Sequence, residues 1–113
     1  MLTGCTETRP PPVGLDEAAR ELDAARNAGA ATYAPLELRN AEERLSQARV
    51  RMDKRDYALA QQLAEESRVD SDLAAAKARL GKAREKVDAR TRENAQLRQD
   101  LNGSSPAPEG NQP

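Results

Sequence analysis

The fold is decided by residues 57–101, which read YALAQQLAEESRVDSDLAAAKARLGKAREKVDARTRENAQLRQDL. This stretch contains no proline and a single glycine, Gly81. Asp56 comes directly before it and is suited to cap a helix, because its carboxylate can accept a backbone N–H of the first turn. We therefore predict one helix over 56–101, of which the 45 residues quoted would span ~68 Å at 1.5 Å per residue. Gly81 costs about 1 kcal/mol in a helix and marks the point where a bend or break is expected.

Two shorter helices are predicted before this one, over 15–27 and 35–52. The first ends in the stretch NAGAAT, because Asn and Gly readily adopt the backbone conformation of a helix C-terminus. Pro35 suits the first turn of the second helix, where the N–H that it lacks would have no partner. Both carry apolar residues at alternating spacings of three and four, which is typical of a helix with one buried face. These residues are Leu15, Ala18, Leu22 and Ala25 in the first helix and Leu38, Ala41, Leu45, Ala48 and Met52 in the second.

The polar residues 53–56, DKRD, indicate a tight turn between antiparallel helices. The predicted fold class is therefore all-α, a short antiparallel helical hairpin or three-helix unit with a long, protruding C-terminal helix. Along the chain we expect a lipobox remnant, a Pro-rich tether, a helical domain and a disordered tail rich in Pro, Gly, Ser and Asn. Their respective ranges are 1–5, 6–14, 15–101 and 102–113.

The second half of the long helix is expected to lack a partner within its own chain. A helix of about 17 residues covers only ~25 Å, so the helix over 35–52 reaches little more than a third of the long one. From Val69 onward the sequence fits a coiled-coil heptad, and Asn94 at an a position is typical of a parallel two-stranded pair. Arg90 and several alanines weaken this seam, so a second copy of the chain and a solvated, partly frayed helix both stay open. The seam residues would be Leu73, Leu80, Val87, Asn94, Leu97 and Leu101, with Val69, Ala76, Ala83 and Arg90.

The composition argues against enzymes and metal proteins. The 113 residues include no His and a single Cys, so the usual zinc and iron ligand sets and an internal disulfide are missing from the sequence. The adjacent carboxylates Glu42-Glu43 and Glu65-Glu66 point in different directions on a helix and do not converge. We therefore predict no catalytic residue, no cofactor and no metal site. No apolar stretch reaches the ~20 residues that span a bilayer, so any membrane attachment is expected to be covalent.

The N-terminal residues Leu2-Thr3-Gly4-Cys5 fit the lipobox of bacterial lipoproteins, in which the cysteine becomes the diacylated N-terminus. The Pro-rich residues 6–14 would then hold the first helix about 25 Å from that anchor, at ~3.1 Å per residue. We predict lipid attachment at Cys5, after a signal peptide encoded upstream of Met1. Without such a leader the protein would stay in the cytoplasm. Thr6, in place of Asp, favours the outer membrane over the inner one.

The segment 32–78 resembles a family of uncharacterised periplasmic lipoprotein domains with a Tyr-Ala-Pro-x-Glu-Leu motif. Here the motif spans Tyr33 to Leu38, and an Asp-Tyr-x-x-Ala turn follows at Asp56, Tyr57 and Ala60. The resemblance implies an outer-membrane lipoprotein of a Gram-negative bacterium, often fused or adjacent to OmpA-like peptidoglycan-binding domains. It implies no catalytic residue.

The function we expect is that of a lipid-anchored lipoprotein on the periplasmic face of the outer membrane, with a structural or adaptor role through helix-helix contacts. Its partners would be the membrane, a second copy or an OmpA-like envelope protein, with peptidoglycan or lipopolysaccharide as charged surfaces. The alternative is a cytosolic dimeric coiled coil that binds nucleic acid. It rests on residues 77–98, which are similar to a basic region leading into a zipper. Acidic residues interrupt that region, which argues against nucleic acid.

Overall fold

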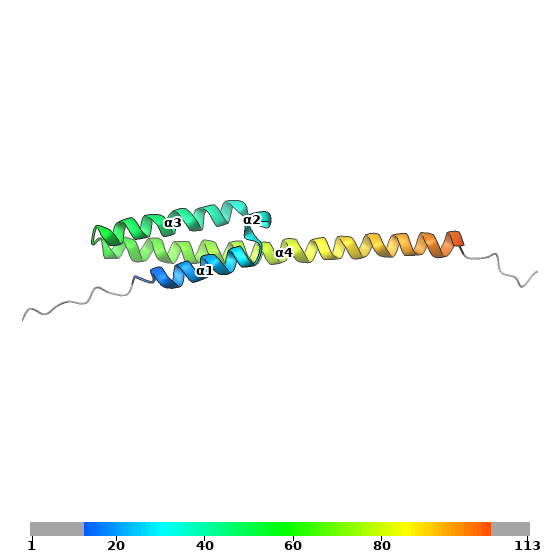
Figure 1. The fold of residues 1–113 in the computed structure, drawn as a ribbon, viewed down its shortest axis with the longest axis horizontal. Helices are drawn as coiled ribbons and strands as arrows, with labels where there is room; N and C mark the ends of the chain where they lie inside the picture. The colour runs from blue at the N-terminus through cyan, green and yellow to red at the C-terminus, as the bar shows by residue number, and fades with distance from the viewer. Residues whose placement is uncertain (1–12, 105–113) are drawn as a thin grey trace, which may run out of the picture. The chain divides into compact units, whose positions relative to one another are not determined.

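The computed structural model describes residues 13–104. Within this range 91% of the residues are helical and there is no strand, so the prediction of an all-α fold is confirmed. Figure 1 labels the helices, which are α1 (Leu15–Asn27), α2 (Ala30–Tyr33), α3 (Pro35–Asp53) and α4 (Tyr57–Ser104).

The chain divides into two compact units, Met1–Arg79 and Leu80–Pro113. In the first unit, α1 and α3 lie along the N-terminal part of α4, and α2 sits at the connection between α1 and α3 (Figure 1). In the second unit, the described residues are the C-terminal part of α4.

The first unit has a thin core built from small residues. Eleven of the fifteen buried apolar residues in its described part, 13–79, are alanines, and the large ones are Val13, Leu22, Leu38 and Leu45. Small side chains let helices approach closely, and the Ser67 hydroxyl on α4 donates a 2.7 Å hydrogen bond to the backbone carbonyl of Ala41 on α3. The buried alanines are Ala18, Ala25, Ala30, Ala34, Ala41, Ala48, Ala60, Ala64, Ala74, Ala75 and Ala78.

A three-residue turn joins α3 to α4. Arg55 has a φ of 60°, in the left-handed region, and the amide of Asp56 donates to the carbonyl of Arg51 at 2.9 Å. The Asp56 carboxylate then accepts the backbone N–H of Leu59 at 3.5 Å, which caps the first turn of α4. The chain reverses here, so α3 and α4 are antiparallel (Figure 1).

The sequence analysis missed α2, a single helical turn at Ala30–Tyr33 between the first two predicted helices. The backbone leaves α1 at Ala28 and enters α2 after Gly29, whose φ of 96° is easily adopted only without a side chain. Three of the four residues of α2 are too small or too polar to form an apolar stripe, so periodicity gave no signal. Ala30 itself is fully buried.

The C-terminal end of α4 also differs from the prediction. The helix runs to Ser104, so residues 102–104, expected in the disordered tail, are helical instead. The helix also continues through Gly81, where a bend or break was expected. No residue from Leu80 to Gly103 is buried. The core of the described chain is therefore confined to residues 13–78.

Candidate functional site

The predicted lipid attachment site, Cys5, lies outside the described residues, as does the tether up to position 12. The last two tether residues are described, and they meet the first unit directly. Val13 is buried in the core, and Gly14, with a φ of 76°, precedes α1. The amide of Ala18 donates to the Gly14 carbonyl at 2.9 Å, so the helical hydrogen bonding of α1 begins at the end of the tether.

The predicted oligomer seam lies wholly on α4. Its large apolar members are exposed in the single chain, with relative exposures of 46% for Leu73, 49% for Leu80, 64% for Val87, 60% for Leu97 and 63% for Leu101. Asn94 is exposed as well. The structure thus puts all six seam residues on one helix with none of them in the core.

Within the first unit, the start of this seam faces away from the core. Ser67, Ser71, Ala74 and Ala78 form the buried row of α4. Val69, Leu73 and Ala76 come two residues after Ser67, Ser71 and Ala74, which on an α-helix is a rotation of about 200°. The packing of α1 and α3 against α4 therefore leaves the face that carries Val69 and Leu73 uncovered.

Ion pairs tie the helices of the first unit together along its surface. Arg26 of α1 meets Glu42 of α3 at 2.8 Å, and Arg68 of α4 meets Glu17 of α1 at 3.5 Å. Lys77 of α4 pairs with Glu37 at the start of α3. Surface pairs contribute little to stability, and their value here is to fix how the helices align.

Two of these pairs shift the pKa values of their members. The hydrogen bond from the Lys77 ammonium lowers the pKa of Glu37 below its ordinary 4.5, and the backbone N–H of Glu37 adds to the effect. The hydrogen bond to Glu42 raises the pKa of Arg26 above its ordinary value, with a smaller contribution from Asp23. Both shifts favour the charged forms that make the pairs.

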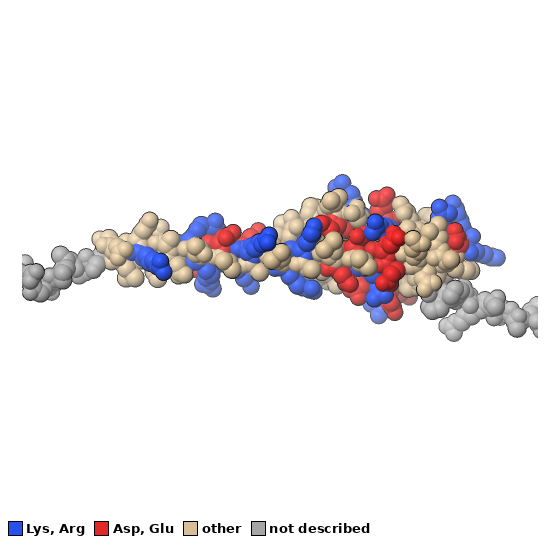
Figure 2. Space-filling view, turned by 180° about the vertical axis from the view of Figure 1, so that it is seen from behind, with Lys and Arg blue, Asp and Glu red and all other residues tan. Residues whose placement is uncertain are grey.

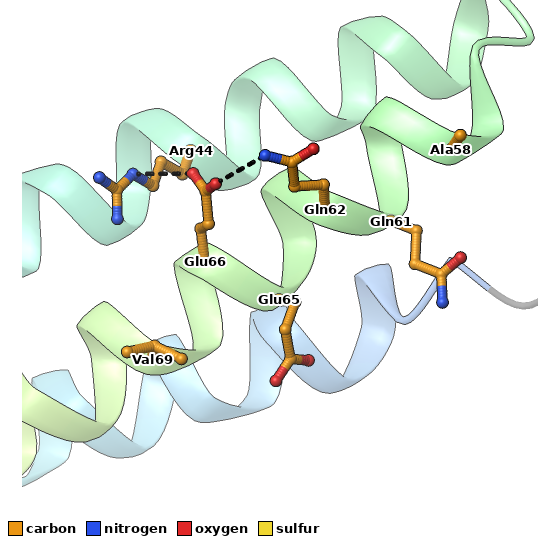
Figure 3. Close-up of a pocket in the computed structure, with 7 residues that line it drawn as sticks. All are labelled: Arg44, Ala58, Gln61, Gln62, Glu65, Glu66 and Val69. Atoms are coloured by element: carbon orange, nitrogen blue, oxygen red, sulfur yellow. Dashed lines mark hydrogen bonds and ion pairs between the residues drawn. The ribbon is translucent and has the colours of Figure 1, made fainter.

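A shallow groove of about 480 Å³ lies beside α4 near its start, lined by residues of α4 and by Arg44 of α3. In Figure 3 the Glu66 carboxylate lies between Arg44 and Gln62, and the distances are 3.5 Å to the Arg44 Nε and 3.1 Å to the Gln62 Nε2. Arg44 also pairs with Asp70. Arg44, Gln62 and Glu66 thus satisfy one another, while Glu65 pairs with Arg68 outside the groove. The other lining residues are Ala58, Gln61, Glu65 and Val69.

Sequence reasoning did not identify Arg44 or the groove. Arg44 is 22 residues from Glu66 and 26 from Asp70, so no local spacing connects them. One signal in the sequence was the row of small residues Ala60, Ala64 and Ser67 on α4. This row marks the face of α4 that packs against α3, and that face decides which carboxylates of α4 lie near Arg44.

Charge is distributed unevenly along the described chain. In Figure 2, acidic side chains gather over the part of the molecule where several helices pack together, and Lys and Arg predominate over the part formed by α4 alone. The stretch 77–98 has eight basic residues against the acidic Glu85, Asp88 and Glu93. Because they are spread around the helix, the basic residues form no single stripe. They are Lys77, Arg79, Lys82, Arg84, Lys86, Arg90, Arg92 and Arg98.

Within residues 13–104, no group of three or more His, Cys, Asp or Glu side chains is placed to hold a metal ion. None of the helices described is both long and apolar enough to cross a membrane.

Comparison with known families identifies the domain. The model of the family called Domain of unknown function (DUF4398) matches residues 14–90, which is more than half of the chain. The chain belongs to this family. The DUF4398 match begins at the glycine before α1 and covers all of the core except Val13, so the family corresponds to the packed first unit plus the start of the second. It ends at Arg90, before Asn94, Leu97 and Leu101 of the predicted seam. No curated protein and no solved structure matches the chain.

Proposed function

We propose that this DUF4398 protein is a lipid-anchored protein of the bacterial outer membrane, attached through Cys5, which acts in the cell envelope by helix-helix contact. The anchor rests on the lipobox Leu2 to Cys5 and the Pro-rich tether that follows it. The contact role rests on α4. A role in catalysis is not part of the proposal.

The observation that carries the contact role is the exposed apolar face of α4 beyond the core. Leu80, Val87, Leu97 and Leu101 are each between 49% and 64% exposed, and none of them belongs to the described core. A helix that presents four large apolar residues at heptad spacing is suited to receive another helix. A helix with only solvent contacts would carry polar residues at these positions.

The anchor is tested by metabolic labelling with radioactive palmitate in cells that express the gene with its in-frame upstream region. We expect label on the wild-type protein and none on the Cys5→Ala variant, with the wild type in the outer-membrane fraction. An unlabelled wild-type protein in the soluble fraction would show that the envelope proposal is wrong. Expression levels are matched by immunoblot, so that loss of label is not loss of protein.

A further inference from the structure

We infer that residues 80–101 of α4 bind the same segment of a second copy, and that the two helices run antiparallel. This inference rests on the proposed helix-contact role and names its partner. The heptad alone favoured a parallel pair through Asn94. The charged residues along the exposed face instead favour an antiparallel pair.

The deciding residue is Arg90, which lies within the seam. In a parallel, in-register pair every seam residue faces its own copy, so two Arg90 guanidinium groups would meet in the interface. Two like charges brought together and partly desolvated oppose association. A hydrogen bond between two Asn94 side chains at an open seam is too weak to offset this repulsion.

An antiparallel pair removes this conflict in one register. When Leu80 lies opposite Leu97 of the second copy, Val87 falls opposite Arg90 and Ala83 falls opposite Asn94. Each layer then joins a larger side chain to a smaller or apolar one, and the aliphatic stem of Arg90 can cover Val87 while its charged end reaches water. Each of these three layers occurs twice in a symmetric pair, so the interface has six layers and extends over ~26 Å of helix.

The same register is self-complementary in charge. Lys86 and Glu93 flank the seam on one side, and in this antiparallel alignment Lys86 of each copy lies beside Glu93 of the other. Within its own chain Glu93 accepts from Arg90 at 3.2 Å, so it would sit between two cations. On the other side Arg84 lies beside Thr91, which is uncharged. Shifting the register by one heptad would bring Glu93 against Glu93 or Lys86 against Lys86, so charge selects this alignment.

The surface is free to be used in this way. Leu80, Val87 and Leu97 are all exposed, and no residue between Leu80 and Gly103 is buried. Only three large apolar residues per copy enter the six layers, so the pair is expected to be weak and to depend on protein concentration.

Sedimentation equilibrium of the full chain carrying Cys5→Ser tests association independently of lipidation, so its failure is distinct from failure of the anchor. We expect a reversible dimer of the otherwise unchanged chain. Its dissociation constant should be at least fivefold higher in Lys86→Glu and should return to the original value in Lys86→Glu/Glu93→Lys. Arg92→Glu, the same charge change outside the seam, should leave it unchanged. In a parallel pair Glu93 lies beside Arg98, and the double variant would not recover. A monomer at all concentrations would overturn the proposal, and the exposed face of α4 would then be a binding surface for a different protein.

Disulfide trapping tests the orientation directly, in the same Cys5→Ser chain. A mixture of Leu80→Cys and Leu97→Cys chains should cross-link between positions 80 and 97 under mild oxidation. Either variant alone should give little dimer. Efficient cross-linking of Leu80→Cys to itself would show a parallel pair and contradict the inference.

Discussion

At the scale of single residues, alignment of the helices in the first unit depends on a few polar contacts set around an alanine core. The Ser67 hydroxyl reaches the Ala41 carbonyl at 2.7 Å inside the unit, while Lys77 and Arg44 pair with carboxylates at its surface. Alanine at the crossing brings the helix backbones close enough for the first contact. The core is therefore sensitive to added volume, and the pair of Glu37 with Lys77 is sensitive to pH, because Lys77 lowers the pKa of Glu37.

Enlarging a core alanine should destabilise the protein. Ala41 is fully buried where α3 meets α4, and Ala41→Leu adds three heavy atoms there, so a loss of about 1–3 kcal/mol in the free energy of unfolding is expected. Urea unfolding followed by circular dichroism at 222 nm measures it. The matched control is Ala95→Leu on the exposed part of α4, which should change stability by less than ~0.5 kcal/mol. Equal effects of the two substitutions would contradict the described core.

The pair between Glu37 and Lys77 predicts a pH dependence of defined sign. The folded pKa of Glu37 lies below its ordinary 4.5, so the stability it contributes is present at neutral pH. That stability is lost as the pH falls from about 4.5 through the folded pKa, because the unfolded state binds the proton first.

Urea midpoints of the wild type and Glu37→Gln, measured from pH 7 to pH 3, test this. The wild type should be the more stable of the two at pH 7, and the gap should close as the solution becomes more acidic. Glu43→Gln, which alters an exposed carboxylate elsewhere on α3, serves as the control and should show a smaller gap at pH 7. A Glu37→Gln gap that stays constant with pH would be inconsistent with the pair.

At the scale of elements, α4 is one helix with two environments. Its first part contributes Ala60, Ala64, Ser67 and Ser71 to the core, and none of its residues from Leu80 to Gly103 is buried. Gly81 lies just after this change and is helical. It is therefore a place where stability can be raised without touching the core.

Replacing Gly81 by alanine should stabilise α4. Alanine has the higher helix propensity and restricts the unfolded chain, for a gain of about 0.5–1 kcal/mol. Amide hydrogen exchange of residues near position 81 should slow correspondingly. Gly29→Ala is the contrasting variant, because a φ of 96° is strained for alanine, and it should lower the urea midpoint. Faster exchange around position 81 in Gly81→Ala would show that the helix is interrupted there.

The helices that sequence periodicity could predict are those with an apolar stripe. Leu22, Leu38 and Leu45 recur at helical spacing, and all three are buried. α2 has no such stripe because it is one turn long, and residues 102–104 carry glycine and asparagine, which favour a helix end. The partners of Arg44 could not be predicted, because they depend on how α3 and α4 are aligned along their axes.

At the scale of the whole molecule, the packed unit and the exposed part of α4 make separable contributions. Among the residues whose burial the structure describes, 13–103, every buried one lies between Val13 and Ala78, and the DUF4398 match spans nearly the same core. The exposed part carries the proposed contact surface. The seam positions on α4 could be predicted from the heptad, but the orientation of a pair depends on Arg90, whose place in the seam weakens the pattern that a parallel coiled coil needs.

A chain that ends at Glu85 should therefore keep the fold of the packed unit. Its urea midpoint is expected to match that of the full chain within the equivalent of ~0.5 kcal/mol, because no buried residue is removed. A chain that ends at Asp70 is the control, since it loses Ser71, Ala74, Ala75 and Ala78, and it should be largely unfolded. A strong loss of stability in the longer truncation would mean that the packed unit depends on the rest of α4.

We propose that Cys5 holds this family member to a membrane, and the mass of the mature N-terminus shows whether it does. The protein is expressed from its gene with the upstream in-frame region, extracted from membranes with detergent and analysed by intact-mass and peptide mass spectrometry. We expect a chain that begins at Cys5 and carries a diacylglycerol group. A chain that retains Met1 and an unmodified Cys5 would contradict it.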